Sequence, residues 1–347
     1  MFSCTEKEKR THVEIKENQF YINGDLTYKD RYWNGHKVEG LLMNSRMVQG
    51  IYDDLNPQSV DRFKYPDTGE WDPNRNTNEF IAAMEAWKNH GMMAFTLNLQ
   101  GGSPMGYGNK NSINSTFKPD GGLRPAYMER LEKVLEKADE LEMVVILGYF
   151  YFGQDHVLKD ETAVIKGVDN ITNWILEKGY KNILVEIANE VDYPRYDHPI
   201  LDVARVHELV ARVKNTEKNG NRLLVSTSFR GGRLPSEKVV DVADFILIHG
   251  NKVENPNDIT TLVEKVRSMK GYSNQPILFN EDDHFNFDAE SNNMVNAVKA
   301  YVSWGYFDFR KEGEAFENGF QTVPVSWGIN SERKKSFFNK LKEITGY

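Results

Sequence analysis

Short runs of apolar residues recur along the chain, and longer segments in which apolar and polar positions mix separate them. Runs rich in β-branched and aromatic residues, bounded by polar or glycine-containing turns, are typical of strands that are covered on both faces. We expect eight such strands, centred on residues 40–44, 92–99, 143–152, 182–188, 222–227, 245–248, 276–279 and 301–307.

Between most of these strands, apolar residues at spacings of three and four predict amphipathic helices. In the segment 123–141, for example, Leu131, Val134, Leu135 and Ala138 share one helical face. The other predicted helices cover residues 78–90, 157–178, 201–219, 259–270, 292–301 and 332–344. Eight strands alternating with helices are typical of the α/β class and of a (β/α)8 TIM barrel in particular. A doubly wound open sheet is the alternative, but no glycine-rich dinucleotide motif follows the first predicted strand.

The first residues of the chain differ in pattern from the rest. Residues 1–12 are polar, and we expect them to form a disordered tail. Residues 13–23 alternate and end at an Asn-Gly pair, which predicts a short β-hairpin that covers the N-terminal mouth of the barrel. No repeat or low-complexity linker divides the remainder, so residues 13–347 are predicted to form one domain.

Composition narrows the classes of function. The net charge is −8 and no basic block is present, so nothing in the sequence favours binding to nucleic acid. The longest apolar run, residues 143–152, is too short to cross a membrane. Aromatic residues make up 12% of the chain, which suits flat contacts with sugar rings but equally suits an ordinary large core.

The single cysteine, Cys4, excludes an intrachain disulfide and a cysteine-rich zinc site. Residues 2–7 look like the end of a bacterial lipoprotein signal, in which the cysteine becomes the lipidated first residue. We therefore expect an exported protein, periplasmic or at the cell surface, that is tethered to a membrane through Cys4. The alternative is an incidental cysteine in a polar terminus.

Two of the predicted strands end in an Asn-Glu pair, which is costly to bury without partners. Asn189 and Glu190 follow the strand at 182–188, and Glu281 closes the strand at 276–279. In a parallel barrel, the carboxyl ends of all strands meet at the face that carries the active site. Two carboxylates there suit acid/base and nucleophilic chemistry on a sugar, although two ordinary surface charges are the alternative.

The Asn189-Glu190 pair after the fourth predicted strand and Glu281 after the seventh resemble the pattern of clan A glycoside hydrolases. These retaining (β/α)8 enzymes include the family-five cellulases and mannanases. The resemblance implies that Glu190 is the general acid/base and that Glu281 is the nucleophile. It also implies double-displacement cleavage of O-glycosidic bonds in a poly- or oligosaccharide, with no cofactor and no metal. The sixth strand ends in His249 rather than tyrosine, and no histidine motif closes the third, so the resemblance is to the clan rather than to family five.

Other residues near the predicted strand ends fit the same site. Asn189 is expected to bond the sugar hydroxyl beside the reacting carbon, and His249 and Arg46 to hold Glu281 ionised and oriented. Trp304 is expected to form the floor of the reacting subsite. Each of the last three has a structural alternative, namely a core histidine, a structural ion pair or a core tryptophan. Further expected sugar contacts are Asn98, Tyr149, Tyr151 and His156.

Two long connections, residues 49–76 and 100–122, follow the first and second predicted strands and are expected on the active-site face. Their shape would decide between exo and endo action. The run Asp282-Asp283-His284 contains usual ligand types, but no second cluster at ligand spacing supports a metal site.

Two rival functions are weighed against a glycosidase. A non-catalytic glycan-binding lipoprotein would keep the barrel without the chemistry, but both catalytic positions hold glutamate. A barrel lyase or aldolase would need a Schiff-base lysine or a metal-ligand set at the strand ends, and the predicted strands offer neither. We expect a monomer whose partner is its carbohydrate substrate.

Overall fold

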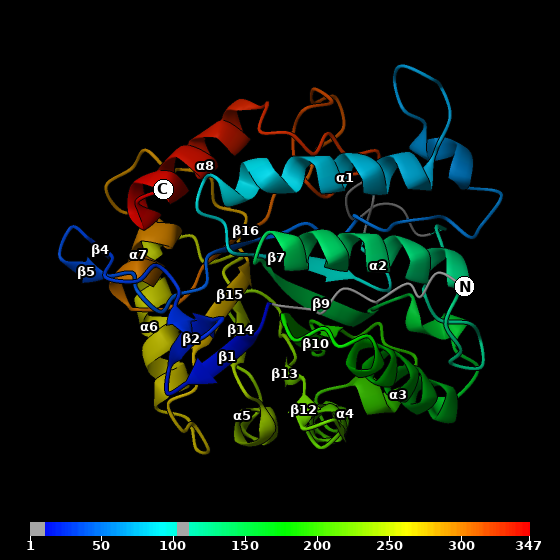
Figure 1. The fold of residues 1–347 in the computed structure, drawn as a ribbon, viewed down its shortest axis with the longest axis horizontal. Helices are drawn as coiled ribbons and strands as arrows, with labels where there is room; N and C mark the ends of the chain where they lie inside the picture. The colour runs from blue at the N-terminus through cyan, green and yellow to red at the C-terminus, as the bar shows by residue number, and fades with distance from the viewer. Residues whose placement is uncertain (1–10, 103–110) are drawn as a thin grey trace, which may run out of the picture.

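The computed structural model describes residues 11–102 and 111–347, and helices surround a ring of parallel strands in it (Figure 1). The strands of the ring are, in chain order, β6 (Asn44–Arg46), β7 (Ala94–Asn98), β9 (Val144–Tyr151), β10 (Ile183–Asn189), β13 (Leu224–Ser226), β14 (Ile246–His249), β15 (Ile277–Glu281) and β16 (Gly305–Tyr306). Each is followed by a helix: α1 (Pro73–Lys88), α2 (Pro125–Glu140), α3 (Glu161–Glu177), α4 (Val206–Lys214), α5 (Glu237–Val242), α6 (Pro256–Arg267), α7 (Asn293–Lys299) and α8 (Glu332–Thr345). This order is a (β/α)8 barrel, as the sequence predicts.

Hydrogen bonds connect neighbouring strands around the ring. Six strands form one parallel sheet in the order β13-β10-β9-β7-β6-β16, and β14 pairs with β15. Single contacts join these two groups: the Asp244 N–H donates to the Val225 carbonyl between β13 and β14, and Leu278 forms a parallel bridge with Ser303 between β15 and β16. Because every pair in the ring is parallel, all strand carboxyl ends lie on one face of the molecule.

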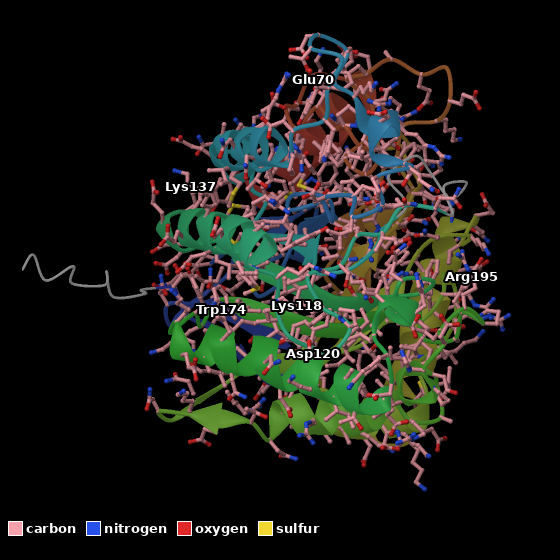
Figure 2. All side chains as sticks on the ribbon, turned by 90° about the vertical axis from the view of Figure 1, so that its right-hand side faces the viewer. Glu70, Lys118, Asp120, Lys137, Trp174 and Arg195 are labelled. Carbon is pink, nitrogen blue, oxygen red and sulfur yellow. The ribbon has the colours of Figure 1, made fainter. Side chains whose placement is uncertain are left out.

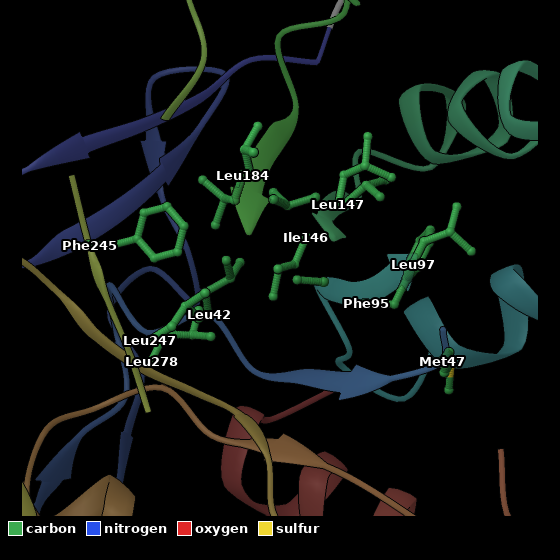
Figure 3. Packing of buried hydrophobic residues seen from close by; sticks show 14 of the residues in the cluster. Leu42, Met47, Phe95, Leu97, Ile146, Leu147, Leu184, Phe245, Leu247 and Leu278 are labelled. Carbon is green, nitrogen blue, oxygen red and sulfur yellow. The ribbon is translucent and has the colours of Figure 1, made fainter. Parts of the chain in front are cut away.

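The alternation along the strands places apolar side chains on both faces of the ring. Phe95 points outward and packs edge-on against Phe80 and Trp87 of α1, at centroid distances of 5.3 and 6.5 Å. Inside, fully buried side chains form what we term the apolar layer (Figure 3). Four of its residues come from β9, β10, β14 and β15, in that order, and Leu42 from the segment before β6: Ile146, Leu184, Leu247, Leu278 and Leu42. Covered on both faces, the strands lack the clean alternation of a half-exposed sheet.

Helix starts follow local capping chemistry more closely than hydrophobic periodicity. Asp72 accepts the N–H groups of Asn74 and Arg75, and Pro73 occupies the first turn of α1. The helix therefore begins five residues before the predicted start at 78. The helix α5 was not predicted, because its six residues, capped by Ser236, are too few to display a period.

The first and eighth strands of the ring are shorter than predicted. The segment 40–44 contributes only its last residue to β6, and residues 41–43 are buried but irregular. The segment 301–307 contributes only the two residues of β16. In both segments the apolar pattern correctly indicates that the residues are buried. The length of the strand is shorter, because only the residues that pair with a neighbouring strand form a hydrogen-bond ladder.

The predicted N-terminal hairpin is present and lies at the N-terminal ends of the strands. It consists of β1 (Val13–Lys16) and β2 (Gln19–Ile22), and β3 (Asp25–Leu26) extends it. The Val13 N–H donates to the Lys181 carbonyl just before β10, and the Phe20 N–H donates to the Gly40 carbonyl before β6. The hairpin therefore covers the mouth of the barrel opposite the strand carboxyl ends. Smaller elements elsewhere are β4 (Tyr32–Trp33), β5 (His36–Lys37), β11 (Glu217–Lys218), β12 (Asn221–Arg222) and the 3-10 turns η1 (Val60–Phe63), η2 (Asp155–Val157) and η3 (Pro199–Leu201).

The last two residues of the predicted tail, residues 1–12, belong to the fold. Thr11 is fully buried, its N–H donates to Asp139 Oδ1 (2.8 Å), and its hydroxyl donates to the Asp139 carbonyl (2.7 Å). The fold thus includes Thr11 and His12. Cys4 lies outside the described residues, so a lipid anchor and an exported location stay predictions. Among the described helices, none has the length and apolar character needed to span a membrane.

The connections after β6 and β7 pack on one another at the carboxyl-end face (Figure 1). The Leu55 N–H donates to the Ile113 carbonyl (2.7 Å), and Asp54 Oδ1 accepts the Ile113 N–H (2.8 Å). Both long loops lie where the sequence places them. Part of the second one, residues 103–110, lies outside the described residues, so exo or endo action stays open.

Candidate active site

The end of β10 turns sharply and presents two polar side chains. The strand is buried along its whole length, and Glu190 follows it with φ of +49°, in the left-handed region that few non-glycine residues adopt. The Glu190 N–H donates to Ser228 Oγ (3.0 Å), and the Tyr196 hydroxyl donates to the Asn189 carbonyl (2.5 Å). The backbone of the Asn-Glu pair is therefore held from two neighbouring segments.

An aromatic stack supports the segment that follows Glu190. The Tyr193 N–H donates to the Glu190 carbonyl (2.8 Å), and the Tyr193 ring stacks on Phe152 at 4.4 Å. The guanidinium of Arg195, an exposed residue labelled in Figure 2, lies 5.6 Å from the centre of the Phe152 ring. Arg230 covers the Tyr193 ring in the same way at 5.7 Å. The stack thus ties the loops after β9, β10 and β13 together beside Glu190.

A β-bulge at the end of β15 brings two consecutive residues to the interior. Ile248 pairs with Phe279, whereas His249 pairs with Glu281, so Asn280 is the extra residue. Regular alternation would place Asn280 and Glu281 on opposite faces. With the bulge, Asn280 Nδ2 donates to Glu186 Oε2 (3.3 Å) and Glu281 Oε2 lies 2.7 Å from Arg46 Nε.

The two predicted catalytic carboxylates meet at the centre of the carboxyl-end face. One oxygen of Glu190, one oxygen of Glu281 and a ring nitrogen of His249 all lie within 4.8 Å of one another. The Glu190 side chain is 13% exposed and that of Glu281 is 5% exposed, so both are largely shielded from water. Strands four and seven therefore supply a close carboxylate pair, although about ninety residues separate the two in the chain.

Arg46, at the end of β6, connects three residues of the site. Its side chain is buried, its Nε lies 2.7 Å from Glu281 Oε2, and its Nη2 donates to Asn189 Oδ1 (2.6 Å). Its Nη1 lies 3.4 Å from Glu186 Oε2. The ion pair with Glu281 that the sequence suggests is present. A buried guanidinium needs such acceptors, because leaving it unpaired would cost several kcal/mol.

Burial and charge shift the titration of the central groups. Burial raises the pKa of Glu281, and the negative charges of Glu190 and Glu186 add to this, while His249 and Arg46 oppose it. Burial lowers the pKa of His249, but the attraction of Glu281 and the hydrogen bond to Glu190 outweigh it, so the net pKa is raised. With both pKa values raised, Glu281 and His249 each retain a proton to higher pH than the free groups would.

His249 is positioned differently from the sequence-based expectation. Its Nδ1 lies 3.3 Å from Glu190 Oε1 and 3.7 Å from Glu281 Oε2, so its hydrogen bond is to Glu190. The side chain that donates to the second oxygen of Glu281 is Asn251, whose Nδ2 lies 2.7 Å from Oε1. Asn251 was not predicted, because a loop residue two positions after a strand carries no periodic signal.

Two of the remaining predicted contacts lie near the carboxylate pair. Tyr151 stands opposite Asn189 in the strand register, and its pKa is raised by burial and then by the charges of Glu281 and Glu190. Asn98 lies at the end of β7 and faces Gly148 on the next strand, where a Cβ would come within 2.2 Å of its Oδ1. Both amide atoms of Asn98 are buried without a protein partner, which leaves them able to bond a ligand.

Tyr149 is not part of the site, whereas a sugar contact by His156 stays a prediction. The Tyr149 hydroxyl lies 3.2 Å from Thr172 Oγ1 on α3, so the ring fills space between the barrel and that helix. His156 is exposed on η2. The sequence places Tyr149 near a strand end, but only the structure decides which side its ring faces.

Trp304 is also removed from the predicted site. It is fully buried, its Nε1 donates to Asp282 Oδ2 (3.0 Å), and its ring packs against Phe287 and Phe337 at 5.9 and 6.1 Å. Phe337 belongs to α8, so Trp304 fills the core between the barrel and that helix. Trp304 is therefore a core tryptophan, which is the structural alternative given for it above.

Two groups of carboxylates and imidazoles have the spacing of metal ligands, namely Glu190, His249 and Glu281, and Asp282, Asp283 and His284. In the first group, a metal ion would compete with the Arg46 guanidinium for Glu281. In the second, Asp282 accepts hydrogen bonds from Trp304 and Asn293, and from His284, whose pKa this bond raises to about 9. A protonated imidazole cannot ligate a metal. A metal ion would have to displace a bound partner or a proton in either group, and the absence of a metal stays a prediction.

One buried carboxylate was overlooked in the sequence. Glu186 lies inside β10, fully buried, and contacts Arg46, Ser228 and Asn280. Its signal is visible in the chain, since it is the only charged residue within an otherwise apolar strand. Ser228 and Tyr196 gave no such signal.

Comparison with known proteins supports the fold. No protein-family model matches the chain, and no curated protein matches it in sequence. Among solved structures, a glycoside hydrolase family 5 mannosidase from Rhizomucor miehei superposes with a TM-score of 0.55 at 12% identity, over 98% of this chain and 99% of that one. A GH5-4 broad-specificity endoglucanase from Ruminococcus flavefaciens gives 0.56 at 14%, over 88% and 97%. A beta-glucosidase from Thermotoga maritima gives 0.54 at 10%, over 89% and 98%.

These likenesses extend over most of each chain, and identities this low establish a shared fold. The chain therefore has the (β/α)8 fold of family 5 and related glycoside hydrolases, which confirms the resemblance at the level of architecture. The chemistry of the site depends on its own residues and not on the fold alone.

Proposed function

We propose that the chain is a retaining glycoside hydrolase that cleaves O-glycosidic bonds of a poly- or oligosaccharide. The observation that carries the proposal is that one carboxylate oxygen of Glu190 and one of Glu281 lie within 4.8 Å of each other, on strands four and seven of the barrel. Retaining enzymes hold their two carboxyl groups about 5–5.5 Å apart, whereas inverting enzymes need about 6.5–9.5 Å to admit a water molecule. The short separation favours retention.

In the first step, an oxygen of Glu281 attacks the anomeric carbon while the bond to the leaving oxygen breaks. Glu190 donates its proton to that oxygen, so the leaving sugar departs as an alcohol and a glycosyl ester forms on Glu281. In the second step, Glu190 removes a proton from water, the water oxygen attacks the same carbon, and Glu281 is released. Two inversions return the original configuration.

Neighbouring groups support these roles. Arg46 and Asn251 each donate to a different oxygen of Glu281, which fixes the carboxylate and stabilises its charge. His249 bonds Glu190, the residue that must both give and take a proton. Arg46 also donates to Asn189 Oδ1, which leaves the Asn189 Nδ2 group to donate to a sugar hydroxyl.

The test is a screen of the purified protein on nitrophenyl glycosides and a polysaccharide panel, with reducing sugars measured and the anomer of the first product read by proton NMR. We expect hydrolysis with retention, a loss of about 10⁴-fold or more in Glu281→Gln, and unchanged folding. Glu190→Gln should lose most on substrates with poor leaving groups, which depend on proton donation. Glu264→Gln, an exposed glutamate on α6, is the matched control.

Three outcomes would contradict the proposal. Hydrolysis by Glu281→Gln at the wild-type rate would show that Glu281 is not the nucleophile. Inversion of configuration at the anomeric carbon would exclude a double-displacement mechanism. Binding to a glycan array without release of reducing ends under any condition favours the non-catalytic glycan-binding alternative.

A further inference from the structure

Glu186 is a carboxylate with no route to substrate. It lies on β10, four residues before Glu190, and its side chain has no exposed surface. Leu184 and Ala188, two positions to either side on the same strand, are apolar and also fully buried. Burying a carboxylate among such neighbours costs several kcal/mol unless partners compensate. An apolar side chain would fill this position at less cost, so the charge calls for a reason.

The partners of Glu186 are the groups that hold the catalytic pair. Its Oε1 accepts a hydrogen bond from the Ser228 hydroxyl, and that same hydroxyl accepts the Glu190 N–H (3.0 Å). Its Oε2 lies 3.4 Å from Arg46 Nη1, and the Nε of that guanidinium lies 2.7 Å from Glu281. One carboxylate is thus two contacts away from each catalytic glutamate.

The third partner of Glu186 also connects it to a catalytic glutamate. Asn280 Nδ2 donates to Glu186 Oε2 (3.3 Å), and Asn280 is the bulged residue that precedes Glu281. A bulge leaves its extra residue outside the regular hydrogen-bond ladder. The bond to Glu186 gives the bulge an interior acceptor, and the bulge is what brings Glu281 into the barrel.

We propose that Glu186 is a positioning residue for the reaction proposed above: its carboxylate holds Arg46, Ser228 and Asn280 in the arrangement that orients Glu281 and Glu190. Glu186 also shares the positive charge of Arg46 with Glu281. Without it, the whole guanidinium charge would act on the nucleophile, which would become a weaker attacking group. The inference rests on the proposed function for its catalytic part only.

The electrostatic consequence has a definite sign. The negative charge of Glu186 is one of the factors that raise the pKa of Glu281, so removing that charge lowers the pKa. The acidic limb of the pH–rate profile, which follows ionisation of the nucleophile, then moves to lower pH. The other charged or titratable groups that face this region are Arg46, Glu190, His249, Tyr151 and Tyr196.

The experiment compares wild type with Glu186→Gln, which keeps the size and removes the charge. Protein labelled with 13C at glutamate carboxyl groups is titrated by NMR, and the Glu281 signal is assigned from its loss in Glu281→Gln. We expect a lower Glu281 pKa in Glu186→Gln and no change in the surface control Glu264→Gln. On any nitrophenyl glycoside that the wild type hydrolyses, we expect kcat to fall about tenfold to a hundredfold, with little change in KM and an acidic limb at lower pH.

A second variant separates the effect of the Glu186 charge from the effect of its side-chain length. Glu186→Asp keeps the charge but shortens the side chain by one methylene, so the Glu281 pKa should stay near that of wild type while kcat falls. An unchanged Glu281 pKa in folded Glu186→Gln overturns the proposal. If Glu186→Gln does not fold, an unchanged kcat in Glu186→Asp overturns it instead. If the wild type hydrolyses no glycoside, the proposed function fails, and the NMR titration still decides whether Glu186 controls Glu281.

Discussion

The apolar layer of the barrel and the site above it are built on the same strands, two residues apart. On β10 the inward-facing residue changes from Leu184 to Glu186, and on β14 it changes from Leu247 to His249. The distance between the two levels is about 7 Å, the rise of two strand residues. Below, side chains need only volume and apolar surface; above, every buried group needs a particular partner.

This difference shows how one scaffold separates stability from chemistry. An apolar residue in the lower level tolerates a substitute of similar volume, because dispersion and burial are not directional. A charged residue in the upper level does not, because its desolvation is compensated only by oriented donors or acceptors. Substitutions at the two levels should therefore fail in different ways. One substitution in each level and a third outside both, at His284, test the comparison.

The largest effect is expected from Arg46→Met, which removes the guanidinium that lies between Glu186 and Glu281. Two buried carboxylates would lose their shared partner, so we expect about 3–5 kcal/mol less stability at neutral pH, measured by urea unfolding. The loss should shrink toward pH 5, because the stranded carboxyls then take up protons. A loss independent of pH would show that packing, not charge, is what Arg46 supplies.

A smaller effect is expected from Leu184→Ala in the apolar layer. Truncation leaves a cavity in a fully buried position, and we expect about 2–4 kcal/mol less stability. Here the loss should not depend on pH, and the folded fraction should keep the wild-type pH–rate profile and KM. A shifted acidic limb in this variant would mean that the lower level takes part in the chemistry, and the comparison would fail.

The smallest effect is expected from His284→Gln, in the loop after β15. The hydrogen bond to Asp282 raises the His284 pKa from 6.5 to about 9. A raised folded-state pKa stabilises the protein fully below about 6.5, and this contribution is lost as the pH rises through about 9. The difference in Tm between wild type and variant should be largest near pH 6 and vanish near pH 10.

Lys334 also titrates within that range. Lys334 has a pKa lowered to about 7, mainly by burial, so it favours the folded state increasingly as the pH rises. It is present in both proteins, and the difference between their Tm curves cancels it. A difference that stays constant with pH would mean that His284 contributes only packing.

Much of the fold could be predicted from the sequence, because strands and helices each leave a period in the chain. Apolar runs located the barrel strands, and capping pairs such as Asp72-Pro73 mark helix starts to within a residue once they are recognised. The failures have local causes. The helix α5 is too short to show a period, and the segment 40–44 is buried without being a strand.

The site was predictable in its charged centre and poorly predictable around it. Glu190 and Glu281 carry their own signal, since each closes an apolar run. Trp304 and Tyr149 misled, because an aromatic ring near a strand end faces either the site or a helix, and the two faces have similar polarity. Asn251 and Ser228 were missed, because their role depends on partners more than twenty-five positions away in the chain.

The sequence by itself determined the order of strands and helices and the two glutamates that close strands four and seven, because burial and backbone geometry leave local, periodic traces. Tertiary structure alone decided that these glutamates meet within 4.8 Å, and that Arg46 lies between Glu281 and Glu186. Those contacts depend on the closure of the ring and on a one-residue bulge in β15. Neither leaves a periodic trace, because a distance between remote residues is a property of the folded chain as a whole.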